Sequence, residues 1–245
     1  MSIRNLILLC IIIFTPMLSN AQTQTGEYTV TSNTNEILGE EISSSYTSVI
    51  DADEEITWEI YVPKNYDPND PPGVMVYISP QNQIKTPSGW MTVMEESNLI
   101  WIAARKSGNK VQTSRRILFA VMSLPLIQQK YQLNVNRIYI SGLSGGGRVA
   151  SIVATEYAHM FKGAIYNCGV NFWNNKNLDQ IELIKKNRFV FVTGTADFNL
   201  QDTKDIYAKY KKAGVEKIKL MVISRMSHEN PKRNKFSQAI NFLDN

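Results

Sequence analysis

The chain has 245 residues, of which 43% are hydrophobic and 20% are charged, and it carries a net charge of +4. This composition excludes a disordered chain and is sufficient for one sizeable core, so we expect one main folded domain. The Lys and Arg residues are scattered and no aromatic residues interleave with them, so we expect no nucleic-acid partner.

The N-terminal residues combine the cation Arg4 with an apolar run from Leu6 to Phe14 and a small-residue end at Ala21. This pattern predicts a signal peptide over residues 1–21, because the apolar run is too short to span about 30 Å of hydrocarbon. Cleavage after Ala21 would leave 224 residues and lower the net charge by one, to +3. It would also leave Cys168 as the single thiol. We therefore expect a secreted or periplasmic protein without an internal disulfide or a membrane-inserted segment.

Residues 22–54 are rich in Thr, Ser, Asn and Glu and predict an edge strand or a loosely held lead-in. Alternating side chains over 55–63 predict a half-exposed strand. Short apolar runs then predict strands buried on both faces at 74–79, 99–104, 137–141, 163–168, 188–194 and 217–224. Helical patterns lie at 88–97, 113–131, 145–159, 201–213 and 232–243. This alternation predicts an α/β fold over residues 55–245, with a mostly parallel sheet, helices on both faces and antiparallel opening strands.

A glycine-rich turn follows the predicted strand at 137–141. Its residues, Gly142-Leu143-Ser144-Gly145-Gly146, fit G-x-S-x-G at the point where a strand ends and a helix begins. A serine at this point needs neighbours without a Cβ so that the turn can close, and its Oγ then stands clear of the sheet. The motif therefore predicts Ser144 as a nucleophile. The alternative, a phosphate-binding loop, lacks the following Lys-Ser or Lys-Thr pair and the G-x-G-x-x-G spacing.

A nucleophilic serine needs a base, and the chain has two histidines. His159 lies 15 residues beyond Ser144 on the same predicted helix, about 22 Å away at 1.5 Å per residue, which excludes it as the base. His228 follows the last predicted strand, at the carboxyl edge where active sites of such sheets lie. We therefore expect His228 to be the base and His159 to be structural.

The third catalytic residue should be a carboxylate that orients the imidazole. Asp197 directly follows the strand at 188–194, at the same carboxyl edge. Asp202 and Asp205 come later, as first-turn residues of a helix, and Asp179 lies in a polar connection. The sequence therefore favours Asp197.

With these residues, the chain resembles secreted α/β-hydrolases of the esterase group, similar to polyhydroxybutyrate depolymerases and to feruloyl and acetylxylan esterases. The resemblance is carried by RIYISGLSGGGRVAS, FKGAIYNCG, VTGTAD and SRMSHENP, and it covers most of residues 55–243. It implies an α/β-hydrolase catalytic domain with a small lid or none. It also implies hydrolysis of carboxylic esters through an acyl-enzyme, with Ser144 as nucleophile, Asp197 as acid and His228 as base, in the usual chain order.

The resemblance also implies an oxyanion hole, with one departure from the family pattern. Relatives usually show His-Gly after the strand that supplies half of the hole, whereas this chain has Ser79-Pro80-Gln81. Proline has no amide hydrogen, so the implied donors are the backbone amides of Gly145 and Gln81.

Three aromatic residues follow strands near the predicted reactive edge and are candidates for substrate contacts: Trp90, Phe172 and Trp173. Arg105, Arg115 and Arg116 near the same edge are candidates for binding an acidic substrate group such as a uronate. No cluster with zinc-ligand spacing is present, and we expect no metal and no cofactor. Two alternatives to an esterase remain: a serine peptidase of the same fold, and a non-catalytic binding protein in which Pro80 marks a damaged oxyanion hole.

Overall fold

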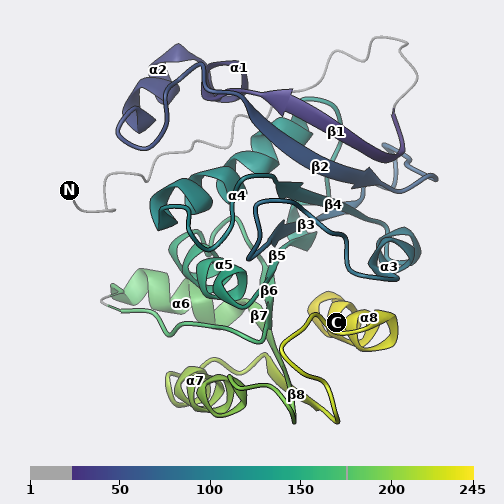
Figure 1. The fold of residues 1–245 in the computed structure, drawn as a ribbon, viewed down its shortest axis with the longest axis vertical. Coiled ribbons are helices and arrows are strands. Elements are labelled where there is room, and N and C mark those ends of the chain that lie inside the picture. Colours follow the sequence, from purple (N-terminus) through teal and green to yellow (C-terminus); the bar gives the residue numbers. More distant parts are fainter. Residues whose placement is uncertain (1–23, 175) are drawn as a thin grey trace.

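The computed structural model describes residues 24–174 and 176–245. The predicted signal peptide, on which the prediction of secretion depends, lies outside these residues. The strands of the described chain form one sheet in the order β1-β2-β4-β3-β5-β6-β7-β8 (Figure 1). Their bounds are Gly26–Ser32 (β1), Ile56–Val62 (β2), Gly73–Ile78 (β3), Leu99–Ala104 (β4), Ile138–Leu143 (β5), Gly163–Asn167 (β6), Arg188–Gly194 (β7) and Ile218–Ile223 (β8).

The sheet is antiparallel where it begins and parallel beyond. Strand β2 pairs antiparallel with β1 and with β4, and every pair from β4–β3 to β7–β8 is parallel. Every residue of β3 and β4 is buried, as expected for strands covered on both faces. The predicted α/β architecture is therefore confirmed, and β1 of residues 22–54 forms one edge of the sheet.

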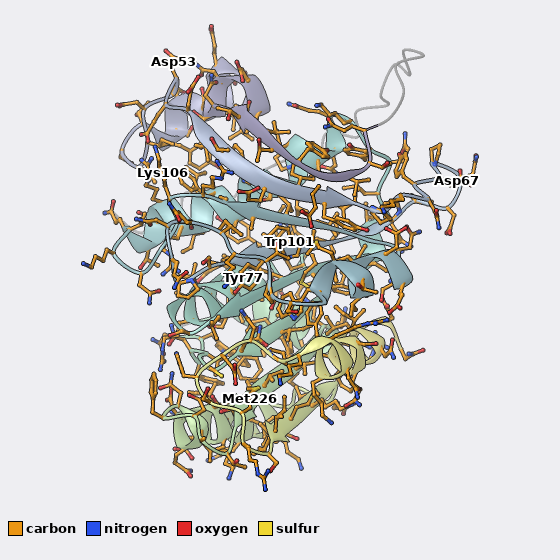
Figure 2. The ribbon with its side chains drawn as sticks, turned by 45° about the vertical axis from the view of Figure 1, so that its right-hand side comes forward. Asp53, Asp67, Tyr77, Trp101, Lys106 and Met226 are labelled. Carbon is orange, nitrogen blue, oxygen red and sulfur yellow. The ribbon has the colours of Figure 1, made fainter. Side chains whose placement is uncertain are left out.

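Helices cover both faces of the sheet (Figure 1). Helices α3 (Trp90–Glu96) and α8 (Arg233–Asp244) pack together on one face. The other face is covered by α4 (Thr113–Gln128), α5 (Gly145–Glu156), α6 (Leu178–Lys186) and α7 (Leu200–Lys212). The short helices α1 (Thr34–Leu38) and α2 (Glu40–Ser43) and the 3-10 turns η2 (Ser44–Tyr46) and η3 (Val135–Arg137) complete the fold. Figure 2 shows Tyr77 and Trp101 in the interior, where their rings stack 5.9 Å apart.

Helix α6 is the main departure from the predicted elements, because the sequence showed only a polar insertion there. The Asn177 side chain caps this helix by accepting a hydrogen bond from the Gln180 amide at 2.8 Å. Ile184 is the one residue of α6 that is buried, so the helix contributes little to the core. Helix α5 ends at Glu156, which leaves His159 in an exposed turn beyond it. No helix in the described ranges is long and apolar enough to cross a membrane.

Candidate active site

Ser144 lies between β5 and α5 in a backbone conformation that L-residues rarely adopt. Its φ is 56° and its ψ is −122°, and its amide donates to the carbonyl of Asn167 on β6 at 2.8 Å. Gly146 makes this turn possible, because a Cβ there would lie 2.0 Å from the carbonyl oxygen of Ile78 on β3. Close packing of the first turn of α5 against β3 therefore holds Ser144 at the carboxyl edge of the sheet.

Replacement of Gly146 with alanine is expected to destabilise the fold by about 3 kcal/mol, because the added methyl group meets backbone that cannot move aside. Gly145→Ala is the matched control, since the three atoms nearest to its added Cβ all belong to the side chain of Asn109, which can rotate. Urea denaturation of both variants measures the difference in unfolding free energy. Equal stabilities would show that β3 and α5 are not held together as tightly as the backbone contact indicates.

Asp197 and His228 lie against each other although 31 residues separate them in the chain. His228 Nδ1 is 2.8 Å from Asp197 Oδ1. The carboxylate is buried and also accepts hydrogen bonds from Thr193 Oγ1 at 2.7 Å and from the Asn199 amide at 3.0 Å. Burial alone would raise the pKa of Asp197, but its hydrogen bonds, chiefly from His228, hold the pKa below its ordinary value. The carboxylate is therefore ionised at neutral pH and fixes the imidazole.

A polar network supports the loop that carries His228. Asn230 Nδ2 donates to the Tyr77 hydroxyl at 2.9 Å, and the Asn230 side-chain oxygen accepts from Asn167 at 3.3 Å. Asn167 also donates to Ser141 Oγ at 3.1 Å. These bonds link the carboxyl ends of β3, β5 and β6 to the histidine loop, which fixes the position of the imidazole relative to the elbow.

A cleft of about 420 Å³ opens at this edge, within the usual size of ligand pockets. The loop after β3 forms one wall and the histidine loop forms another, and the lining includes Leu143, Gln81 and His228. Ser144 follows Leu143 and is partly exposed. No hydrogen bond joins Ser144 Oγ to the imidazole of His228 in the structure; in enzymes of this type that bond often forms only when substrate binds.

The fold also groups three side chains of metal-ligand type. Donor atoms of Cys168, Asp197 and His228 lie within 4.8 Å of one another, which spacing in the sequence did not reveal. The Cys168 thiol donates to the carbonyl of Glu229 at 3.4 Å, and burial raises its pKa well above its ordinary value. The Cys168 thiol and the Asp197 carboxylate are thus both hydrogen-bonded to protein groups, an arrangement that suits an oriented Asp-His pair.

The two implied oxyanion donors differ in their surroundings. Gly145 begins α5, where backbone amides have no partner within the helix. The Gln81 amide already donates to Ser79 Oγ at 3.0 Å.

The side chain of Asn109 lies over Gly145, since a Cβ on Gly145 would fall 2.2 Å from Asn109 Oδ1 and 3.1 Å from Nδ2. Sequence reasoning missed Asn109, because it lies in a polar loop after β4 with no motif around it.

The three candidate arginines are all engaged elsewhere, which corrects the prediction that they bind an acidic substrate group. Arg105 pairs with Glu59 and Arg115 with Glu54. Arg116 is buried and donates to the carbonyls of Ser107 at 2.8 Å and Ser79 at 3.1 Å. Burial lowers the pKa of Arg116 to about 10. Arg116 therefore holds the loop after β3 against the loop that carries Asn109.

Of the three predicted aromatic contacts, that of Trp90 needs correction. Trp90 is fully buried, stacks on Phe236 and donates to the carbonyl of Pro231 at 2.9 Å, so it packs in the core and cannot contact substrate. Phe172 and Trp173 stack on each other and line a different pocket, between α5 and α7. Phe198, which sequence reasoning missed, is 77% exposed and stacks on the His228 ring with 4.0 Å between centroids.

The strand order, the elbow after β5 and the placement of Asp197 after β7 and His228 after β8 define the α/β-hydrolase fold. The chain is similar to a solved ferulic acid esterase, with a TM-score of 0.66 and 14% identity over 90% of this chain and 99% of the other. It is also similar to an S-formylglutathione hydrolase of Staphylococcus aureus, with a TM-score of 0.63 and 14% identity over 90% of this chain and 100% of the other.

A dipeptidyl peptidase 4 of Porphyromonas gingivalis matches with a TM-score of 0.62 and 16% identity, but 89% of this chain covers only 35% of that one. No protein-family model and no curated protein sequence matches the chain. At such identities the similarity establishes the fold. The resemblance to α/β-hydrolases that the sequence motifs indicate is therefore confirmed for the fold.

Proposed function

We propose that the protein is a serine carboxylesterase in which Ser144, His228 and Asp197 form the catalytic triad. The observation that carries this proposal is the 2.8 Å contact between His228 Nδ1 and the buried Asp197 carboxylate. A strained serine at the G-x-S-x-G elbow on the same sheet edge supplies the nucleophile. Esterases among the similar solved structures support an ester as substrate.

Catalysis would proceed in two half-reactions. His228 Nε2 takes the proton of Ser144 Oγ while Oγ attacks the ester carbonyl, and Asp197 stabilises the imidazolium that forms. The intermediate collapses by breaking the bond to the alcohol oxygen, which receives the proton from His228. Water then attacks the acyl-enzyme with His228 again as base, which releases the carboxylic acid and restores Ser144.

The oxyanion would bind the Gly145 amide and one further donor, either the Gln81 amide or the side-chain amide of Asn109. Asn109 is favoured because the Gln81 amide is already bonded to Ser79 Oγ and Pro80 has no amide hydrogen. The exposed face of Phe198 beside His228 would bind the acyl or alcohol group, and would suit an aromatic group such as a feruloyl ester.

Asn109→Ala is expected to lower kcat about 100-fold with little change in KM, because a donor aimed at the oxyanion acts mainly in the transition state. Ser79→Ala is the discriminating variant, since it frees the Gln81 amide without removing it. Steady-state kinetics with p-nitrophenyl acetate measure both. If Asn109→Ala keeps wild-type kcat, the second donor is the Gln81 amide.

Reaction of the wild-type protein with a fluorophosphonate probe tests the proposed function, followed by turnover of p-nitrophenyl acetate, methyl ferulate and a dipeptide p-nitroanilide. Labelling together with ester cleavage is the expected result. Cleavage of the anilide at a rate comparable to the esters would make the protein a peptidase. A protein that neither labels nor turns over would be a binding protein with this fold.

We also propose that the enzyme acts outside the cytoplasm after cleavage at Ala21. The short apolar run before this residue supports the proposal. N-terminal sequencing of protein recovered from the producing cells tests it.

A further inference from the structure

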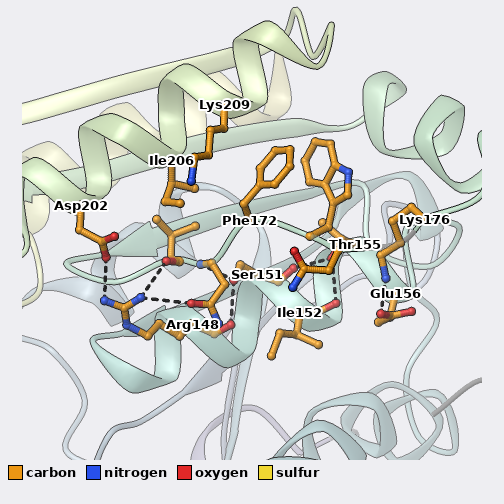
Figure 3. A pocket seen from close by; sticks show the side chains of 14 residues that line it. Arg148, Ser151, Ile152, Thr155, Glu156, Phe172, Lys176, Asp202, Ile206 and Lys209 are labelled. Carbon is orange, nitrogen blue, oxygen red and sulfur yellow. Dashed lines mark hydrogen bonds and ion pairs between the residues drawn. The ribbon is translucent and has the colours of Figure 1, made fainter. Parts of the chain in front are cut away.

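A second pocket, separate from the cleft at His228, lies between α5 and α7 (Figure 3). Its volume is about 460 Å³, and we call it the α5–α7 pocket. At one end Arg148 pairs with Asp202 at 2.7 Å, and at the other Lys176 pairs with Glu156. Arg148 and Glu156 are eight positions apart on α5, which gives the pocket a length of about 12 Å.

The α5–α7 pocket begins beside the nucleophile. Arg148 is one helical turn beyond Ser144 and donates to the carbonyl of Val170 at 3.1 Å. Gly169, next to Val170, packs directly on Ser144, because a Cβ there would lie 2.3 Å from the Ser144 carbonyl oxygen. The Arg148 end of the pocket therefore lies about one helical turn along α5 from Ser144.

The charges in the α5–α7 pocket favour an anion. Three cations line it, Arg148, Lys176 and Lys209, against the two carboxylates of Asp202 and Glu156. Both carboxylates are ion-paired, whereas Lys209 has no ion-pair partner among the described residues. Figure 3 shows Lys209 pointing into the pocket beside Ile206. Lys209 would therefore pair with a negatively charged ligand group.

The remaining lining favours a saccharide. Phe172 and Trp173 stack 4.2 Å apart and form an aromatic wall, and both pack edge-on against Tyr210, which holds them in place. Asn171 and Asn174 also line the pocket and offer side-chain amides for hydroxyl groups. A flat apolar wall, amides and a cation together suit a sugar ring that bears a carboxylate.

We propose that the α5–α7 pocket binds a uronic acid residue of a saccharide whose ester is presented to Ser144. The choice of ester substrate rests on the proposed function, whereas binding in the pocket does not. The pocket thus takes over the recognition of an acidic group that Arg105, Arg115 and Arg116 cannot provide, because each is engaged elsewhere.

Tryptophan fluorescence provides the test, because Trp58, Trp90 and Trp101 are buried and Trp173 is the partly exposed one of the four tryptophans. The Ser144→Ala protein is titrated with glucuronic acid and with glucose, which differ only in the carboxylate. Glucuronate is expected to saturate the signal at about tenfold lower concentration than glucose, and Trp173→Phe is expected to remove the signal. Added salt should reduce the difference between the two sugars.

Lys209→Ala is expected to abolish the preference for glucuronate. Lys204→Ala is the matched control, since Lys204 is exposed on the same helix but does not line the pocket, and it should keep the preference. Equal binding of the two sugars, no saturation with either, or an unchanged preference in Lys209→Ala would overturn the proposal.

Fluorophosphonate labelling of the wild type tests the proposed esterase independently of sugar binding. If the enzyme is labelled but the titration shows no saturation, only the proposal for the α5–α7 pocket is refuted. If the titration saturates but the enzyme is not labelled, the pocket proposal is supported and the proposed esterase function is refuted.

Discussion

Replacement of Ser144 with alanine is expected to abolish fluorophosphonate labelling and to lower kcat/KM for p-nitrophenyl acetate by about 10⁴-fold or more. The covalent route disappears with Oγ, and the remaining rate comes from the oxyanion donors and from binding alone. His228→Ala should also lose labelling, because Ser144 then has no base. The two effects are not expected to add, since both residues act in the same step.

Ser123→Ala is the matched control for Ser144→Ala. Ser123 is buried in α4 and donates only to the carbonyl of Phe119 at 3.0 Å, so this variant should label as the wild type does. Urea denaturation of Ser144→Ala shows whether the fold is retained, since alanine must adopt the same strained φ of 56°. Labelling of a folded Ser144→Ala protein would place the nucleophile elsewhere in the chain.

The buried strands and the elbow could be predicted from the sequence because each depends on local patterns. Continuous apolar runs indicate the strands β3 to β7. The glycines around Ser144 indicate one tight turn between a strand and a helix. The placement of Asp197 and His228 after successive strands also follows from chain order, because carboxyl ends of parallel strands share one edge.

What the sequence could not provide is the packing of loops against one another. Trp90 follows the oxyanion strand, yet it packs under α8 against Phe236, a partner 146 positions away. The position of Asn109 over Gly145 depends on Arg116, which joins two loops through the carbonyls of Ser79 and Ser107. Such contacts join residues far apart in the chain, and neither periodicity nor spacing reports them.

Asp197→Asn is expected to lower kcat/KM by about 10³-fold or more while the protein stays folded. The carboxylate accepts a hydrogen bond from His228 Nδ1–H at 2.8 Å, which keeps the proton on Nδ1 and leaves Nε2 free to take the proton of Ser144. An asparagine can present its amide to Nδ1, which moves the proton to Nε2 and leaves the wrong tautomer at the nucleophile. Steady-state kinetics beside Asp205→Asn measure the effect, since Asp205 is exposed on α7 and bonds only Gln201.

The pH dependence separates this positioning role from a general loss of structure. Because hydrogen bonds hold the pKa of Asp197 below its ordinary value, the carboxylate remains ionised at every pH at which an imidazole titrates. The interactions of Asp197 also stabilise the fold above the ordinary carboxyl range, and this stability is lost as the pH falls through its lowered pKa. Asp197→Asn should lack that acid-induced loss of stability, which urea denaturation at neutral and at acid pH measures. Wild-type rates in a folded Asp197→Asn protein would remove Asp197 from the triad.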